Sequence, residues 1–197
     1  MKTIIKLALP ALMCLAASDA KATILQLDIR GTAGFGLLSG NEPSLAFPTS
    51  SSGGEIGTGI LYDDVANLLT LNVGWGSSQG FTDLSSLANN SHIHGPTAGN
   101  NGNNGTSNFT QVAGVLFNLS RSSNAVTGGT FTTTSITLTE PQEADLLNGK
   151  YYINIHTANN GGGEMRGFIV QSVPEPSTAI LAAVGCAGVL LRRRRAQ

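Results

Sequence analysis

The sequence predicts an all-β fold, an antiparallel β-sandwich or barrel with one short helix. Three observations lead to this prediction. Between the two ends of the 197-residue chain, short segments of alternating apolar and polar residues are separated by Gly, Ser and Asn. One stretch alone, 140–147, has the pattern of a helix. The roughly 150 residues between the ends are enough for one hydrophobic core, so a single domain is the simplest organisation.

The first predicted strand covers 24–30, where apolar residues alternate. The next two strands, 57–62 and 68–75, flank a turn at Asp63-Asp64, which predicts a hairpin. Its inward-facing residues are Leu69, Leu71 and Val73. Further strands are expected over 84–94, 111–119 and 129–137, and a loop over 42–54.

The expected helix, Glu140 to Leu147, has recognisable ends. Thr139 is a suitable N-cap, Pro141 is tolerated in the first turn, and Gly149 lies just past the last turn. These signals predict a short helix that leads directly into the next strand.

The stretch from Gly149 to Val170 predicts a β-hairpin. Turn-forming residues, 159–163, separate its two apolar runs. Because strand residues alternate between faces, one face carries Tyr151, Ile153 and Ile155 and the other carries Tyr152, Asn154 and His156. Glu164 and Arg166 precede the second apolar run, Phe168 to Val170.

All three histidines of the chain lie in two strand-like stretches. His92 and His94 project from one face of the first, with Ile93 on the other face and Gly95-Pro96 at its end, and His156 belongs to the hairpin. Two imidazoles at i and i+2 with a third from another strand can form a three-nitrogen metal site, for which Cu(II) has the highest intrinsic affinity. The alternative is that the imidazoles are half-buried hydrogen-bonding residues that hold loops together.

Both ends of the chain are typical of export signals. Basic residues, an apolar run over 7–17 and the small-residue pattern Ala20-Lys21-Ala22 predict a signal peptide cleaved after Ala22. At the other end, Pro174, Glu175 and Pro176 precede an apolar segment, 178–191, and then four arginines. Residues 172–197 resemble the PEP-CTERM sorting signal of Gram-negative bacteria. The resemblance implies a transmembrane helix at 178–191, which anchors the protein transiently in the inner membrane, and processing by an exosortase. A plain C-terminal tail anchor is the alternative.

Removal of both ends leaves an acidic domain without cysteine. The mature region, 23–175, has four basic and eleven acidic residues, a net charge of about −7. This charge argues against binding to nucleic acid. Cys14 and Cys186 both lie in the removed ends, so disulfides and a cysteine-type zinc site are excluded. No motif of a hydrolase or a nucleotide-binding protein is present.

The motif H-I-H-G-P at 92–96, the helix at 140–147 and the motif G-K-Y-Y-I-N-I-H-T…G-G-E-M-R-G at 149–167 together resemble the CHRD domain. The resemblance covers most of the mature chain, from Ile24 to about Gln171. It implies an immunoglobulin-like Greek-key β-sandwich at 23–171 and gives no general biochemical activity.

CHRD domains are in turn distantly similar to Cu/Zn superoxide dismutases. That similarity implies that His92, His94 and His156 match copper ligands and that Arg166 matches the arginine that attracts superoxide. The bridging fourth histidine, the zinc ligands and the disulfide cysteines of the dismutases are missing here. Arg166 is therefore the one candidate for a catalytic role, and a salt bridge to Glu164 or another acid is the alternative.

Three functions remain open. The first, which the two export signals favour, is a non-catalytic protein of the cell surface or extracellular biofilm matrix, processed by signal peptidase and an exosortase, with exopolysaccharide or other matrix components as candidate partners. The second is a copper-binding module that uses the three histidines. The third is a copper-dependent redox enzyme related to the dismutases.

Overall fold

The structure, a computed structural model, describes residues 23–43, 45–98 and 108–172. The expected signal peptide (1–22), the Pro-Glu-Pro motif and the expected membrane segment (178–191) lie outside these residues. Among the residues that the structure describes, no helix is long and apolar enough to cross a membrane.

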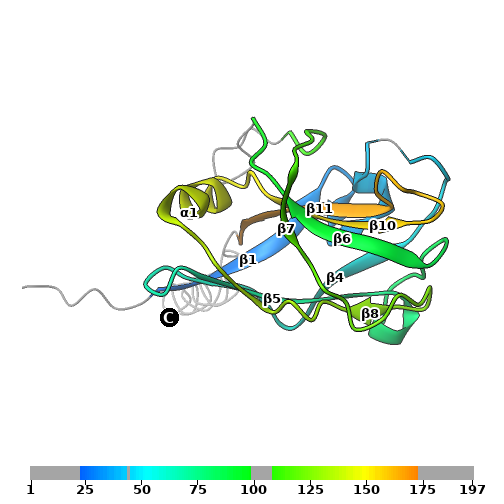
Figure 1. The fold of residues 1–197 in the computed structure, drawn as a ribbon, viewed down its shortest axis with the longest axis horizontal. Helices are drawn as coiled ribbons and strands as arrows, with labels where there is room; N and C mark the ends of the chain where they lie inside the picture. Colours follow the sequence, from blue (N-terminus) through cyan, green and yellow to red (C-terminus); the bar gives the residue numbers. More distant parts are fainter. Residues whose placement is uncertain (1–22, 44, 99–107, 173–197) are drawn as a thin grey trace, which may run out of the picture.

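The described chain is mostly antiparallel β-structure with a single short α-helix, as the sequence predicts (Figure 1). The strands are β1 (Ile24–Gly31), β2 (Gly34–Phe35), β3 (Leu37–Leu38), β4 (Ser52–Asp63), β5 (Leu68–Trp75), β6 (Ala88–His94), β7 (Val115–Asn118), β8 (Gly129–Thr130), β9 (Ser135–Thr137), β10 (Tyr152–Thr157) and β11 (Met165–Gln171). The helices are α1 (Glu140–Leu147) and two 3-10 turns, η1 (Ser39–Asn41) and η2 (Ser77–Gln79).

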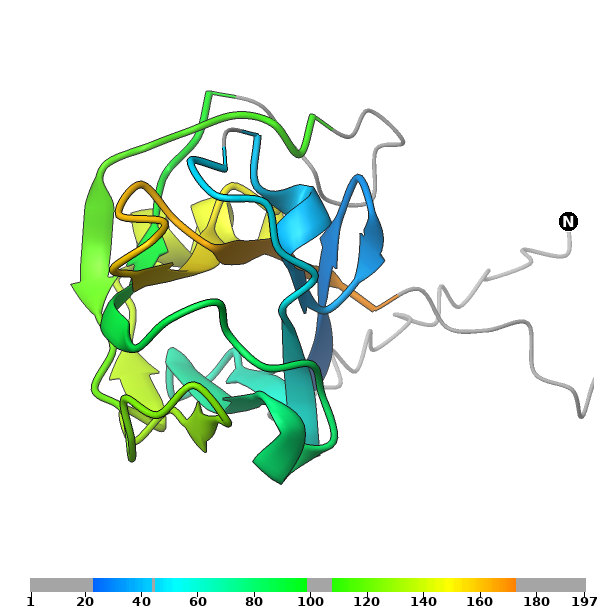
Figure 2. The same cartoon turned by 90° about the vertical axis from the view of Figure 1, so that its right-hand side faces the viewer.

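The strands form the two layers of a Greek-key sandwich. One layer contains β11, β10, β6 and β7, and the other contains β4, β5, β8 and β9 (Figures 1 and 2). β1 joins the layers, because its first half pairs with β4 and its second half pairs with β11. The pairings β1 with β11 and β6 with β10 connect segments that are far apart in the sequence.

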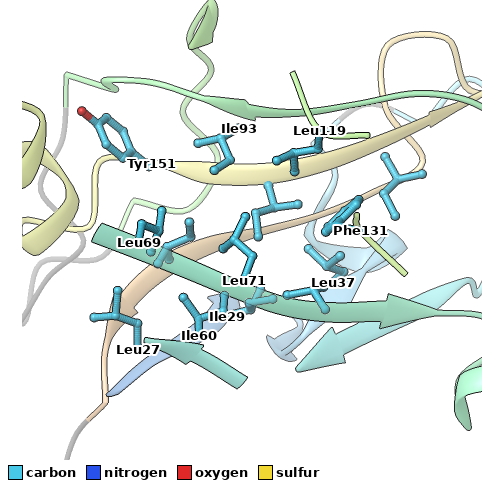
Figure 3. Packing of buried hydrophobic residues seen from close by; sticks show 14 of the residues in the cluster. Leu27, Ile29, Leu37, Ile60, Leu69, Leu71, Ile93, Leu119, Phe131 and Tyr151 are labelled. Carbon is cyan, nitrogen blue, oxygen red and sulfur yellow. The ribbon is translucent and has the colours of Figure 1, made fainter. Parts of the chain in front are cut away.

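Apolar side chains from both layers fill the space between them (Figure 3). Leu69, Leu71 and Val73 of β5 face inward, as the alternation predicts, and are at most 1 % exposed. From the other layer, Ile93 and Ile153 reach the same core and are fully buried. This core fixes which face of each strand is turned away from it.

The helix α1 begins and ends where the sequence predicts. The side chain of Gln142 accepts a hydrogen bond from the backbone N–H of Thr139 at 2.9 Å, which satisfies a donor at the start of the helix. Gly149 follows the last turn with φ of +64°, a conformation that glycine adopts without strain.

Three expected strands are shorter in the structure, and residues in the missing part of each form hydrogen bonds outside the strand ladder. Of 84–94 only β6 is a strand, since Ser85 N donates to Glu164 at 2.6 Å. Of 129–137 only β8 and β9 form; the hydroxyl of Thr133, between them, accepts from Ser120 N at 2.8 Å. Of 111–119 only β7 forms, because residues before it contact Arg166, as described below.

A buried carboxylate, that of Glu164, joins the loops at one end of the sandwich. It is fully buried and accepts hydrogen bonds from four residues, Ser51, Ser85, Thr157 and Asn160. Burial raises the pKa of Glu164, but the hydrogen bonds from Ser51, Ser85 and Thr157 outweigh it, so the pKa lies below its usual value. The carboxylate is therefore charged at neutral pH.

Gly167 of β11 allows the hairpin to lie close to β1. A Cβ at this position would collide with Ile29 and would lie 2.7 Å from the carbonyl oxygen of Gly36. We expect Gly167→Ala to lower the free energy of unfolding by about 1–3 kcal/mol, measured by urea denaturation. Gly161→Ala is the control, because its Cβ meets no atom within 4 Å; equal losses in both variants would contradict this role of Gly167.

Glu164→Gln should lower the free energy of unfolding at pH 7 by at least about 2 kcal/mol, because charge-assisted hydrogen bonds are lost. A lowered pKa stabilises the fold above the unfolded value of about 4.5, and this contribution is lost as the pH falls through the folded value. The wild-type and variant stabilities should therefore converge in acid. Parallel stability curves from pH 7 to pH 3 would show that the carboxylate charge plays no such role.

Candidate metal centre

The pairing of β6 with β10 places the three histidines on one face of the sheet. In this register His94 lies opposite Tyr152 and His92 lies opposite Asn154. Since Ile93 and Ile153 point into the core, the neighbouring positions point away from it, and His156 is on that outer face two residues beyond Asn154. The expected alternation of both strands is confirmed.

The imidazole rings of His92, His94 and His156 converge. One nitrogen of each ring lies within 4.8 Å of the corresponding nitrogen of the other two. The closest pair is Nδ1 of His92 and Nε2 of His156, at 3.1 Å. The ring centroids are 4.9 to 5.8 Å apart. The structure thus brings together the three residues that the sequence singles out.

Backbone carbonyl groups fix the orientation of two of the rings. Nδ1 of His94 lies 3.0 Å from the carbonyl oxygen of Ala113, and Nδ1 of His156 lies 3.0 Å from that of Gly161. A carbonyl only accepts, so both Nδ1 atoms carry the proton and both Nε2 atoms keep a lone pair. Nε2 of His94 is buried and has no hydrogen-bond partner among the described residues. Metal-binding histidines are commonly oriented in this way.

Burial keeps two rings of the cluster, those of His92 and His94, neutral. His92 is 6 % exposed and His94 is 8 % exposed, whereas His156 is partly exposed, so the cluster opens to solvent at His156. Burial, together with the charges of His156, His94 and Arg121, lowers the pKa of His92 to about 4. Burial also lowers the pKa of His94, against the opposing effect of the Ala113 carbonyl. Both rings are neutral at pH 7, the form that binds metal ions.

The spacing suits a metal ion after a small adjustment. Metal–nitrogen bonds of about 2.0–2.1 Å place two ligand nitrogens no more than about 4.2 Å apart. The ligand nitrogens of the three histidines lie within 4.8 Å of one another, which exceeds that value by less than an ångström. A shift of the rings by less than an ångström would close the difference.

Arg166 lies inside the domain and does not form the expected salt bridge to Glu164. It is 1 % exposed, and its Nη2 donates to the carbonyl oxygens of Phe109 at 2.6 Å and Gln111 at 2.7 Å. It forms no ion pair with Glu164; the one ion pair within the described residues joins Lys150 to Asp145 at 2.7 Å. Burial lowers the pKa of Arg166, while the charge of Glu42 opposes this effect. Nη2 of its guanidinium therefore bonds to backbone carbonyls inside the domain and is not presented at the protein surface.

Two residues near the histidines, Tyr152 and Ala113, were not predicted from the sequence to be part of the site. Tyr152 stacks on His94, with ring centroids 4.8 Å apart and an interplanar angle of 3°, and its hydroxyl contacts both N and O of Ala113 at 3.3 Å. The alternation that found His156 also places Tyr152 on this face. No sequence signal indicates that Ala113 lies beside it.

Comparison with known proteins identifies two regions of the chain. Residues 37–169 match a family model described as the CHRD domain, and residues 172–195 match the PEP-CTERM protein-sorting motif. No curated protein and no solved structure matches the chain.

The sorting motif follows directly after β11. It marks a protein that is exported, held for a time by a membrane anchor and processed by an exosortase, and that then resides at the surface or outside the cell. The other match spans about two thirds of the chain and includes both strands that carry the histidines. The chain therefore belongs to the CHRD domain family.

Proposed function

We propose that this exported CHRD domain binds Cu(II) through His92, His94 and His156 and acts as a binding module rather than as an enzyme. The observation that carries the proposal is the orientation of His94 and His156. In both rings a backbone carbonyl accepts from Nδ1, so Nε2 keeps its lone pair. Nε2 of His156 lies 3.1 Å from Nδ1 of His92, whereas Nε2 of His94 is buried and has no hydrogen-bond partner among the described residues. Structural histidines that merely hold loops need no such buried, unpartnered nitrogen.

The choice of copper follows from the ligands. The mature region offers imidazole nitrogens and contains no cysteine. Among divalent ions of the first transition row, Cu(II) binds nitrogen ligands most tightly. Three protein ligands would leave coordination positions for water, which reaches the cluster at the partly exposed His156.

The dismutase-like alternative receives less support. It requires an arginine that presents its charge to an incoming anion, whereas Arg166 is buried and bonded to two carbonyl groups. A fourth histidine to bridge two metals is absent from the sequence. Copper sequestration or buffering at the cell surface fits the site better than fast redox turnover.

The export signals at both ends of the chain support a role outside the cell. We propose cleavage by signal peptidase after Ala22 and by an exosortase near Pro174, Glu175 and Pro176. The chain then divides into a signal peptide (1–22), the CHRD sandwich (23–171) and the sorting signal (172–197). The mature domain would reside at the cell surface or in the extracellular matrix, where exopolysaccharide and other matrix components are candidate partners.

Copper titration of the processed protein, residues 23–175, tests the site. We expect one Cu(II) per chain, measured by competition with a chelator and by elemental analysis. The triple variant His92→Ala, His94→Ala, His156→Ala should retain no copper. A polyhistidine tag must be avoided, because the chain itself contains only three histidines.

Asn118→Ala is the matched control, since Asn118 lies opposite His92 in the sheet and is exposed. It should bind copper like the wild type. If the wild-type protein binds no more copper than the triple variant, the metal proposal is wrong and the histidines have a structural role.

The pH dependence provides an independent check. Because the pKa of His92 is lowered to about 4 and that of His94 is lowered as well, protons should compete with copper at these two rings only in acid. We expect the apparent affinity to change little between pH 7.5 and pH 6 and to fall steeply below about pH 5. A tenfold loss already at pH 6, as for ordinary imidazoles with a pKa of about 6.5, would contradict the burial argument.

A further inference from the structure

We propose that Arg166 is a positioning residue for this copper site. It holds residues 108–113, here called the cover segment, against the outer face of the sheet, so that the carbonyl of Ala113 orients His94. This inference rests on the proposed copper site, but the orientation of His94 can be tested without the metal.

The cover segment lies on the same face as the histidines. Phe109 is 8 % exposed and packs against Phe168, with ring centroids 5.6 Å apart. Together with Tyr152 and Val170 these rings form a second apolar cluster, and Ala113 packs against it. The segment thus closes over the outer side of β10 and β11.

Arg166 supplies the polar attachment of this segment. Its Nη2 donates to the carbonyl oxygens of Phe109 and Gln111, at 2.6 and 2.7 Å. Hydrogen bonds from a charged donor are stronger than neutral ones, and here they are shielded from water. The guanidinium also lies over the ring of Tyr152, 4.4 Å from its centroid. Arg166 therefore fixes the segment and the tyrosine at once.

The far end of the segment reaches His94. Ala113 O accepts from Nδ1 of His94 at 3.0 Å, and the hydroxyl of Tyr152 contacts both polar atoms of Ala113 at 3.3 Å. The ring of Tyr152 is stacked against that of His94. No hydrogen bond joins Arg166 to a histidine ring within the described residues. Besides the direct effect of its charge, which lowers the pKa of His94, Arg166 reaches that ring through the segment and the tyrosine.

Loss of Arg166 should change the tautomer of His94. Without the two hydrogen bonds, the carbonyl of Ala113 is no longer held in place, and the imidazole proton can move to Nε2. A protonated Nε2 is not a ligand, so copper affinity falls. A purely structural arginine would change stability without changing this tautomer.

The test compares Arg166→Met, which keeps the apolar stem, with Arg166→Lys, which restores a charged donor. In metal-free protein, nitrogen NMR of His94 should show the Nδ1–H tautomer in the wild type, an appreciable Nε2–H population in Arg166→Met, and partial return to the wild-type state in Arg166→Lys. Copper affinity should fall about 10- to 100-fold in Arg166→Met.

Arg121→Met is the matched control. It also removes a positive charge near the cluster, but Arg121 bonds to Ser91 and Asn124 and not to the cover segment. Its His94 tautomer should match the wild type; copper affinity is not the readout of this control, because the charge of Arg121 acts on His92. An equal Nε2–H population of His94 in Arg121→Met and Arg166→Met would show that the attachment of the cover segment does not set this tautomer and would overturn the inference.

The inference is also overturned if Arg166→Met folds and has the His94 tautomer and the copper affinity of the wild type. It is overturned as well if His94 of the wild type carries its proton on Nε2. If Arg166→Met does not fold, Arg166→Gln replaces it, since its neutral amide cannot restore the charged attachment, and the same outcomes apply. Should the wild type bind no copper, the proposed function fails, while the tautomer comparison still decides the role of Arg166.

Discussion

The register between β6 and β10 is the constraint on which the metal centre depends. With His94 opposite Tyr152, the isoleucines between the polar positions enter the core and the imidazoles face outward. A slip of one residue would exchange the two sets, burying imidazoles in an apolar layer and exposing Ile93 and Ile153 to the opposite face. The hydrophobic effect that assembles the sandwich therefore also brings His92, His94 and His156 together.

The outer face of this sheet is polar and yet largely buried, and this combination determines what can cover it. The acceptors on this face are backbone carbonyls: those of Phe109 and Gln111 accept from Nη2 of Arg166, and that of Ala113 accepts from Nδ1 of His94. A regular strand would use its carbonyls in the ladder of the sheet. An irregular segment can turn them toward side chains, which explains why β7 begins only at Val115.

Local patterns predicted the faces of the strands and the ends of α1, because a two-residue period and helix caps depend on neighbouring residues alone. The same logic failed for Arg166. Glu164 lies before β11 begins at Met165, so the two residues do not follow strand alternation and their side chains serve separate networks. The partners of Arg166 are 55 and 57 residues away in the sequence, a proximity that only the complete fold creates.

The position of β11 affects how this protein is made. The last strand of the domain is an inner one, paired with β1, β3 and β10, and Ser172 just after it donates to Gln26 at 3.2 Å. The first and last strands must therefore meet before either layer is complete, and such long-range pairing is slow to form. A chain that crosses the membrane from its N-terminus can finish folding only when the residues next to the sorting motif have crossed. The domain thus completes its fold at nearly the same time as the C-terminal anchor reaches the membrane.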